Sequence, residues 1–245
     1  MQRYQIKIEY DGYKYVGWQY QKNGLSIQEI LEKAIYKYLN EKIKVVGAGR
    51  TDAKVHAIEQ SAHIDIKKKI KKDSFISGVN YFIGNHNVSI LDLKKRKKNF
   101  HARHSAKRRT YHYLIINRRS SLALHKNRAW FVKKKLNTIL MKKSLKLLIG
   151  THDFSTFRAA SCEAKSPIKT LEKAELVKKR DTIKIIFSSK SFLQQQVRSM
   201  VGSIKYVGQK KWTITEFKKK FKSKKRFNCA PPAPASGLYL KKVLY

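Results

Sequence analysis

The order of strand-like and helix-like patterns in the first hundred residues is the feature that most limits how this chain can fold. Residues 4–10 alternate between apolar and polar side chains as a strand does. Residues 26–35 open with a capping-box pattern at Ser26 and Glu29 and continue with apolar side chains at helical spacing. The elements expected next are a strand at 42–46, a strand at 61–66, a helix at 73–83 and a strand at 88–93. The order is therefore β-α-β-β-α-β.

The rest of the chain also mixes strands and helices without strict alternation. The elements expected there are a strand at 110–116, a helix at 136–149 stopped by Gly150, a hairpin of 170–177 with 182–188, a helix around 197–204, a short helix from Thr213 and a last strand at 237–244. This mixture favours an α+β fold over a doubly wound parallel sheet. We expect an N-terminal half at residues 1–100 and a C-terminal half at 101–245, with the boundary within 94–108.

The charge of the chain points to a polyanionic partner. Its 56 lysines and arginines oppose 16 acidic residues, so the formal net charge is +40, which would repel itself without such a partner. Nucleic acid fits best, because no segment has the basic amphipathic pattern of a membrane-surface helix. Part of the excess is compositional, and the sequence leaves open whether the lysine runs at 67–72 and 218–225 contact RNA or only solvent.

Cysteine usage and hydropathy indicate an intracellular protein. Cys162 and Cys229 are far apart and form no CxxC pair, which indicates neither a disulfide framework nor a cysteine zinc site. The first residues have no apolar signal-peptide core, and no run reaches the roughly 18 apolar residues of a membrane span. We expect a soluble, cytoplasmic protein with no membrane association.

The stretch GAGRTDAKVHA, residues 47–57, is the strongest candidate for chemistry. A dinucleotide-binding loop would need glycine where Asp52 stands, and a Walker loop would need GK[ST], so a phosphate-binding loop is excluded. Asp52 could instead act as a nucleophile or base, kept ionised by Arg50 two positions earlier. The simpler alternative is an aspartate that caps a turn and forms a surface ion pair worth under about 1 kcal/mol.

Two further segments carry candidate functional residues, and the first of them suits RNA recognition. FHARHSAKRRTYHYL, residues 100–114, interleaves basic residues with Tyr111 and Tyr113, and such residues track phosphates and stack on unpaired bases. These tyrosines could equally be core residues of a strand. QQQVRSM places Arg198 among apolar helix positions, where a buried arginine needs a partner, for which Asp52 is the candidate. No acid or cysteine lies near the histidines of the first segment, so no metal site is expected.

These segments together resemble the tRNA pseudouridine synthase A (TruA) family. GAGRTDAKVHA resembles its catalytic loop and FHARHSAKRRTYHY its substrate-tyrosine segment. The remaining matches are YDG with GWQ near the N-terminus, GTHDFSTFR, FLQQQVRSMVG and APPAPASGLYL. They follow the family's order and cover essentially the whole chain.

The resemblance implies a fold, a reaction and a set of site residues. The fold would be two ferredoxin-like βαββαβ halves sharing a mainly antiparallel sheet with helices on one face, and the active unit a homodimer. The activity would be isomerisation of uridine to pseudouridine at tRNA positions 38 to 40 in the anticodon arm, without a cofactor. Asp52 would be the nucleophile, and Arg50, Tyr111 and Arg198 would bind the substrate. The alternative is a basic RNA-binding or assembly protein that keeps the fold without chemistry.

Two positions depart from the family pattern, with Lys54 and Glu59 where glycine is expected. If the turn needs a positive φ at residue 54, lysine costs about 1 kcal/mol or more. The sequence therefore predicts either a permissive turn or a slower enzyme.

Overall fold

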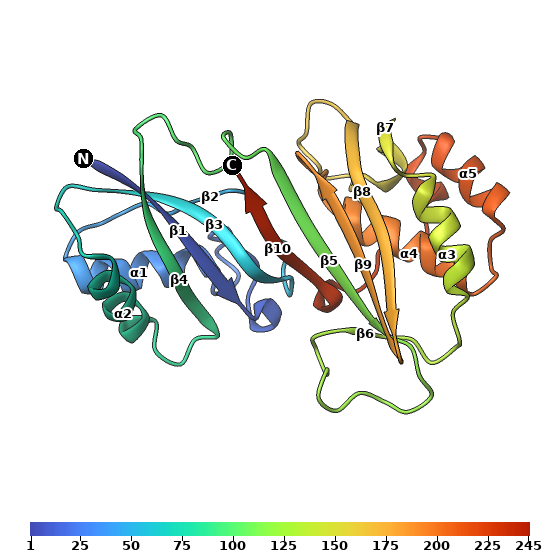
Figure 1. The fold of residues 1–245 in the computed structure, drawn as a ribbon, viewed down its shortest axis with the longest axis horizontal. Coiled ribbons are helices and arrows are strands. Elements are labelled where there is room, and N and C mark those ends of the chain that lie inside the picture. Colours follow the sequence, from blue (N-terminus) through green and yellow to red (C-terminus); the bar gives the residue numbers. More distant parts are fainter. The chain divides into compact units, whose positions relative to one another are not determined.

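The computed structural model describes residues 1–245 and divides into two compact units. The first contains Met1–Lys107 and Tyr239–Tyr245, and the second contains Arg108–Leu238. Both combine helices with mainly antiparallel strands, which confirms the predicted α+β class (Figure 1).

The first unit is built on strands in the order β4-β1-β3-β10. Its elements are β1 (Gln2–Tyr10), the 3₁₀ turn η1 (Gly12–Lys14), α1 (Ile27–Leu39), β2 (Val46–Gly47), β3 (His56–Ile66), α2 (Lys72–Ile83), β4 (Val88–Arg96) and β10 (Leu238–Leu244), of which Tyr239 onward belongs to this unit. β1 is antiparallel to β3 and to β4, whereas β10 is parallel to β3. The predicted β-α-β-β-α-β order is therefore present, with β10 added.

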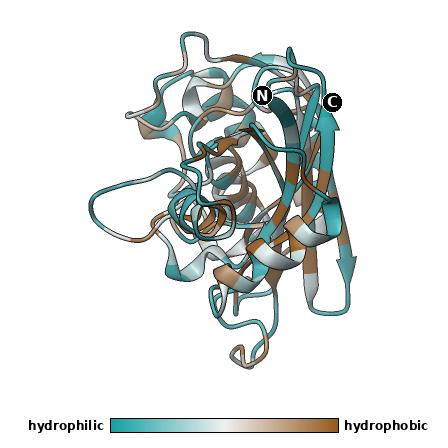
Figure 2. Cartoon of the chain, turned by 90° about the vertical axis from the view of Figure 1, so that its left-hand side faces the viewer, coloured by the Kyte–Doolittle hydropathy of each residue, from teal (hydrophilic) through white to brown (hydrophobic).

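Alternation along β1 decides which face of this sheet is buried. Tyr4, Ile6, Ile8 and Tyr10 are all at most 5% exposed, as a strand with one covered face requires. α1 buries the apolar stripe predicted from the sequence: Ile27, Ile30, Leu31, Ala34 and Ile35. In Figure 2, hydrophobic and hydrophilic colours alternate along the strands in the same way.

The second unit has the strand order β5-β9-β8-β7. Its elements are β5 (Arg108–Ile116), β6 (Trp130–Phe131), α3 (Thr138–Lys146), β7 (Gly150–Asp153), η2 (Ser155–Phe157), β8 (Ile168–Lys179), β9 (Thr182–Ser189), α4 (Gln196–Gly208), α5 (Ile214–Lys222), η3 (Arg226–Asn228) and η4 (Ala235–Gly237). The predicted hairpin is β8 with β9, and the predicted short helix is α5. None of the helices is long and apolar enough to span a membrane.

Two local predictions are wrong. The strand expected at 42–46 shrinks to β2, because the N–H of Val45 donates to the Glu32 carboxylate at 2.9 Å and not to a neighbouring strand. The helix expected to reach Ile149 ends at Lys146, and Gly150 opens β7. The N–H groups of residues 147–149 bond three residues back, so the chain tightens into a 3₁₀-like turn before that glycine.

Candidate active site

The candidate catalytic loop joins β2 to β3 and is clamped by the segment that follows β1. The N–H of Trp18 donates to the carbonyl of Thr51 at 3.1 Å, and the N–H of Lys54 donates to the carbonyl of Tyr15 at 3.3 Å. Backbone bonds of this kind depend on chain path rather than on side chains. The loop is thus fixed by residues more than thirty positions earlier.

Two glycines of the preceding segment make this close approach possible. A β-carbon at Gly12 would lie 1.9 Å from the carbonyl oxygen of Val55. One at Gly17 would lie 2.6 Å from the carbonyl oxygen of Thr51, and Gly17 also has a φ of +116°. Only glycine fits both positions. The YDG and GWQ segments therefore contain the two glycines, Gly12 and Gly17, that allow the loop to be held in place.

Side chains of β1 and β3 fix the loop further. The Tyr10 hydroxyl and Thr51 Oγ1 lie 2.9 Å apart in a buried hydrogen bond. Nε2 of Gln60 donates to the carbonyl of Gly49 at 3.0 Å. The loop that presents Asp52 is thus held on its N-terminal side and at its centre.

Asp52 and Arg50 leave this clamped loop two residues apart. The carbonyl of Asp52 accepts the N–H of Val55 at 3.2 Å, which makes residues 52–55 a tight turn. The Asp52 side chain is half-buried and the Arg50 side chain is exposed. The arrangement presents a carboxylate on a rigid turn with a guanidinium beside it in the chain.

Lys54 adopts the left-handed conformation that its glycine-like position suggested. Its φ is +65°, and its Nζ lies 5.5 Å from the centroid of the Tyr13 ring. Glu59 is not among the positive-φ residues, and its carboxylate lies 3.3 Å from Nζ of Lys7. Of the two departures from the family pattern, only Lys54 strains the backbone.

Tyr111 and Tyr113 share one face of β5 but have different surroundings. Tyr113 is fully buried, and its hydroxyl donates to the carbonyl of Pro234 at 2.7 Å. Burial raises the pKa of Tyr113 well above its usual value. Tyr111 is half-buried, with its ring edge-on to Phe192 at 5.2 Å. Tyr113 is therefore a core residue, whereas Tyr111 is only partly buried.

Arg198 lies in the first turn of α4 and is oriented by the C-terminal motif. Its Nε donates to the carbonyl of Ala233 at 2.8 Å, and the N–H of Ala233 donates back to the carbonyl of Arg198 at 3.0 Å. A β-carbon at Gly202 would lie 2.1 Å from the carbonyl oxygen of Pro231, so the motif runs directly against the helix. Sequence reasoning singled out Arg198 but missed Ala233, whose role lies in its backbone.

His56 is a buried residue of the loop's base that the sequence reading missed. It is 2% exposed, its Nδ1 accepts the N–H of Gly12 at 3.2 Å, and its ring stacks on Tyr239 at 4.6 Å. The available signal was its position directly after Val55, at the start of β3.

Of the histidines in residues 100–114, His101 supports the local backbone. Nδ1 of His101 accepts the N–H groups of Arg103 and His104 at 3.1 and 3.3 Å. No group of three or more histidine, cysteine, aspartate or glutamate side chains is arranged to hold a metal ion. Both cysteines are free thiols.

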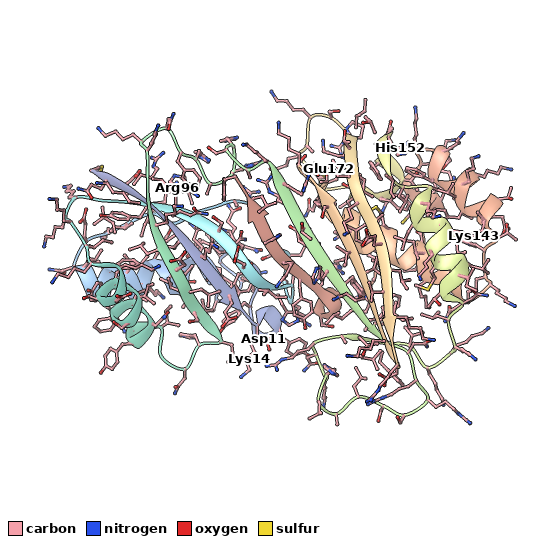
Figure 3. All side chains as sticks on the ribbon, in the orientation of Figure 1. Asp11, Lys14, Arg96, Lys143, His152 and Glu172 are labelled. Atoms are coloured by element: carbon pink, nitrogen blue, oxygen red, sulfur yellow. The ribbon has the colours of Figure 1, made fainter.

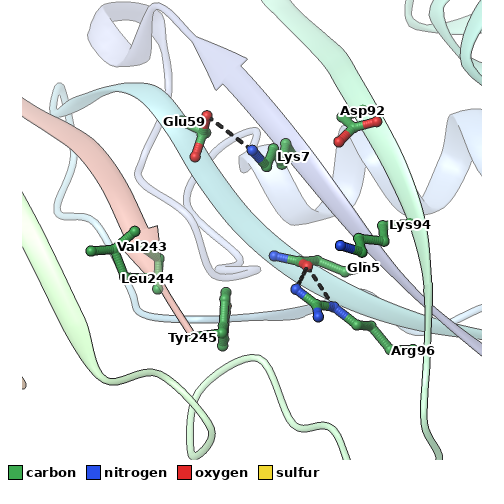
Figure 4. Close-up of a pocket in the computed structure, with 9 residues that line it drawn as sticks. All are labelled: Gln5, Lys7, Glu59, Asp92, Lys94, Arg96, Val243, Leu244 and Tyr245. Carbon is green, nitrogen blue, oxygen red and sulfur yellow. Dashed lines mark hydrogen bonds and ion pairs between the residues drawn. The ribbon is translucent and has the colours of Figure 1, made fainter.

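A pocket of about 270 Å³ opens on the sheet of the first unit (Figure 4). It is lined by Gln5, Lys7, Glu59, Asp92, Lys94, Arg96 and residues 243–245, and by none of the predicted site residues. Its carboxylates are paired, Glu59 with Lys7 at 3.3 Å and Asp92 with Lys72 at 2.6 Å, and the Arg96 guanidinium donates to Oε1 of Gln5 at 2.6 and 2.9 Å. This pocket lacks the features of a reaction centre.

The fold and these motifs are those of an enzyme that modifies RNA. Comparison with known proteins identifies its family. Residues 6–105 and 145–245 match the family model described as tRNA pseudouridine synthase, so the chain belongs to that family. It is 55% identical over 246 residues to "tRNA pseudouridine synthase A" of Pelagibacter ubique (strain HTCC1062), covering 100% of both chains. It is 43% identical to the protein of the same name from Parvibaculum lavamentivorans, again over the full length of both. The resemblance identified from the sequence is confirmed.

Proposed function

We propose that this chain isomerises uridine to pseudouridine in tRNA. Its full-length relatives carry the name of that activity, and its net charge of +40 suits a polyanionic substrate. The observation that carries the proposal is the clamped turn at residues 52–55, because it presents a half-buried carboxylate on a backbone that cannot relax away.

The reaction rearranges bonds within one nucleotide. The bond from N1 of uracil to C1′ of ribose breaks, the base turns and C5 joins C1′. The proton of C5 leaves to solvent and N1 takes up a proton, so product and substrate are isomers. Nothing is consumed, so the chemistry requires no cofactor. Asp52 is the proposed nucleophile, and attack on the sugar or on the base both agree with a carboxylate at this position.

The other proposed site residues have roles that suit their surroundings. Arg50 is exposed and would occupy the space left by the extruded nucleotide. Tyr111 is half-buried with its ring edge-on to Phe192, and this ring would pack on the uracil. Arg198 would pair with the Asp52 carboxylate, with its guanidinium oriented by the carbonyl of Ala233.

Family likeness also supports a target, an assembly and a location. The target is the anticodon arm at positions 38 to 40, where extruding a base from a loop or stem end costs least. The active unit is a homodimer, and the enzyme acts in the cytoplasm, where tRNA is processed.

The decisive experiment measures release of tritium from C5 of uracil in labelled tRNA. The parent protein should release label in the presence of a chelator, and Asp52→Asn should not, while both bind tRNA with similar affinity. Equal release by parent and Asp52→Asn would refute the role of Asp52. Tight binding without any release would favour the non-catalytic RNA-binding alternative.

A further inference from the structure

Between Lys205 and Arg226, in the C-terminal part of the second unit, nearly all charged side chains are positive. This stretch contains nine lysines and one arginine against a single acid, Glu216. The carboxylate of Glu216 is engaged in the capping box of α5, accepting the N–H of Thr213 at 2.7 Å. One carboxylate against ten cationic side chains leaves this stretch strongly positive.

α5 is anchored by one face, so its lysines occupy defined positions. Phe217 and Phe221 are buried, and the ring of Phe221 stacks on Phe157 at 5.3 Å. The opposite face carries Lys218, Lys219 and Lys222, all of them exposed. Like charges at i and i+4, as at positions 218 and 222, destabilise a helix by roughly 0.2–0.5 kcal/mol. A phosphate backbone laid along this face would remove that repulsion.

The turn after α5 exposes an aromatic ring among these cations. Phe227 in η3 is 80% exposed, and Nζ of Lys225 lies 5.8 Å from its ring centroid. The turn is tied to α4, because Nη1 of Arg226 donates to Oγ of Ser199 at 2.7 Å. An exposed ring beside lysines, on a turn that is bonded to α4, combines the two features with which proteins hold unpaired nucleotides.

Other cations of this part of the chain lie on aromatic rings. Nζ of Lys220 lies 4.9 Å from the Trp212 ring, and Nζ of Lys211 lies 5.1 Å from the Tyr206 ring. These contacts place an aromatic ring beside each of the two ammonium groups, so this region carries aromatic rings as well as positive charge. Lys143, labelled in Figure 3, is a further exposed lysine on α3, which contacts α5.

We propose that Lys218, Lys219, Lys222, Lys225 and Phe227, here called the α5–η3 surface, bind a stretch of the tRNA substrate other than the reacting nucleotide. The lysines would neutralise phosphates and Phe227 would stack on an unpaired base. The inference rests on the proposed function, since that function supplies the RNA. The surface is a docking site and takes no part in bond breaking.

The first test neutralises the lysine stripe in the full chain. The triple variant Lys218→Gln, Lys219→Gln, Lys222→Gln should raise the Kd for tRNA roughly tenfold or more near 0.15 M salt and make the slope of log K against log salt shallower by about 2. Its kcat at saturating tRNA should equal that of the parent. The matched control is Lys67→Gln, Lys68→Gln, Lys69→Gln, an exposed run of the first unit, for which we expect a smaller change. A parental Kd and a parental salt slope in the Lys218, Lys219 and Lys222 triple variant would overturn the proposal.

The second test addresses stacking. Phe227→Ala should weaken tRNA binding about 5- to 100-fold and Phe227→Trp should preserve it, as base–aromatic stacking predicts. Leu124→Ala is the control, because Leu124 is also highly exposed, at 91%. A Phe227→Ala variant with parental affinity would refute the stacking role. Binding of vesicles with anionic lipid that depends on the same lysines, without any effect on tRNA, would assign the surface to a membrane and overturn the proposal.

The two proposals can fail separately. If the parent releases no tritium but the α5–η3 variants still lose tRNA affinity, the surface stands and the synthase activity does not. If the parent releases tritium and the variants bind tRNA as the parent does, the activity stands and the surface does not.

Discussion

Gly12 and Val55 meet so closely that a β-carbon on the glycine would lie 1.9 Å from the valine's carbonyl oxygen. The contact joins the turn after β1 to the end of the candidate catalytic loop. Because Val55 also closes the turn that begins at Asp52, a change at Gly12 is transmitted directly to the proposed nucleophile.

Gly12→Ala should therefore damage both stability and catalysis. The loop must shift to clear the new methyl group, at a cost of roughly 1–3 kcal/mol. A displacement near 1 Å at a catalytic group can lower kcat about 100-fold. The measurements are urea unfolding and tritium release at saturating tRNA.

Gly78→Ala is the matched control within the same unit. Its β-carbon would lie 2.2 Å from the ring of Tyr38, so this variant also loses stability, but α2 does not support the loop. Its kcat should stay near the parental value. A Gly12→Ala variant with parental kcat would show that the loop tolerates displacement.

Arg198→Lys tests whether the guanidinium is needed rather than its charge. Nε of Arg198 donates to the carbonyl of Ala233, and the proposed partner of its guanidinium is the Asp52 carboxylate. A lysine ammonium cannot reproduce this fork geometry, so kcat should fall about tenfold or more while the salt dependence of tRNA binding stays unchanged. A parental kcat in Arg198→Lys would remove Arg198 from the proposed site.

The sequence predicted most elements because burial leaves a periodic trace. The α1 stripe from Ile27 to Ile35 was read correctly, since each of its residues packs on the core. The prediction of a strand at 42–46 is wrong, although polar and apolar side chains do alternate there. Ile43 and Val45 are buried by side-chain packing. The N–H of Val45 donates to Glu32 and not to a neighbouring strand.

The candidate site was only partly readable for a related reason. The loop around Asp52 carries its own motif, so local sequence identified it. Its support by Gly12 and Gly17, and the orientation of Arg198 by Ala233, depend on backbone groups more than thirty residues away. A single sequence contains no signal of such contacts, because a carbonyl oxygen is present at every residue.

The buried imidazole of His63 should make stability fall in mild acid. Burial, with the positive charge of Arg3 nearby, lowers the pKa of His63 to about 4. Between pH 6.5 and about 4, the imidazole of His63 is therefore protonated in the unfolded chain but neutral in the folded chain. His63 therefore does not change the free energy of unfolding above pH 6.5, and it lowers this free energy by roughly 3 kcal/mol as the pH falls to about 4. Urea unfolding at several pH values measures this loss.

His63→Asn is the variant that isolates this contribution. Its side-chain oxygen can accept the N–H of Ala102, which Nδ1 of His63 accepts at 3.2 Å. The pH dependence between 6.5 and 4 should become flatter, with a remainder from His101, whose pKa is also lowered by burial. An unchanged slope in His63→Asn would place the acid sensitivity elsewhere.

Lys54→Gly should stabilise the protein without lowering its activity. Lysine at a φ of +65° pays a steric cost that glycine does not, and the relief exceeds the extra freedom of glycine in the unfolded chain. The free energy of unfolding should rise by about 1 kcal/mol, with kcat at or above the parental value. Lys54→Ala keeps a β-carbon and should give no such gain. Arg180→Gly, at an exposed turn with a φ of 53°, should gain stability similarly while leaving kcat unchanged. If Lys54→Gly and Lys54→Ala unfold at the same urea concentration, the turn at residue 54 stores no strain.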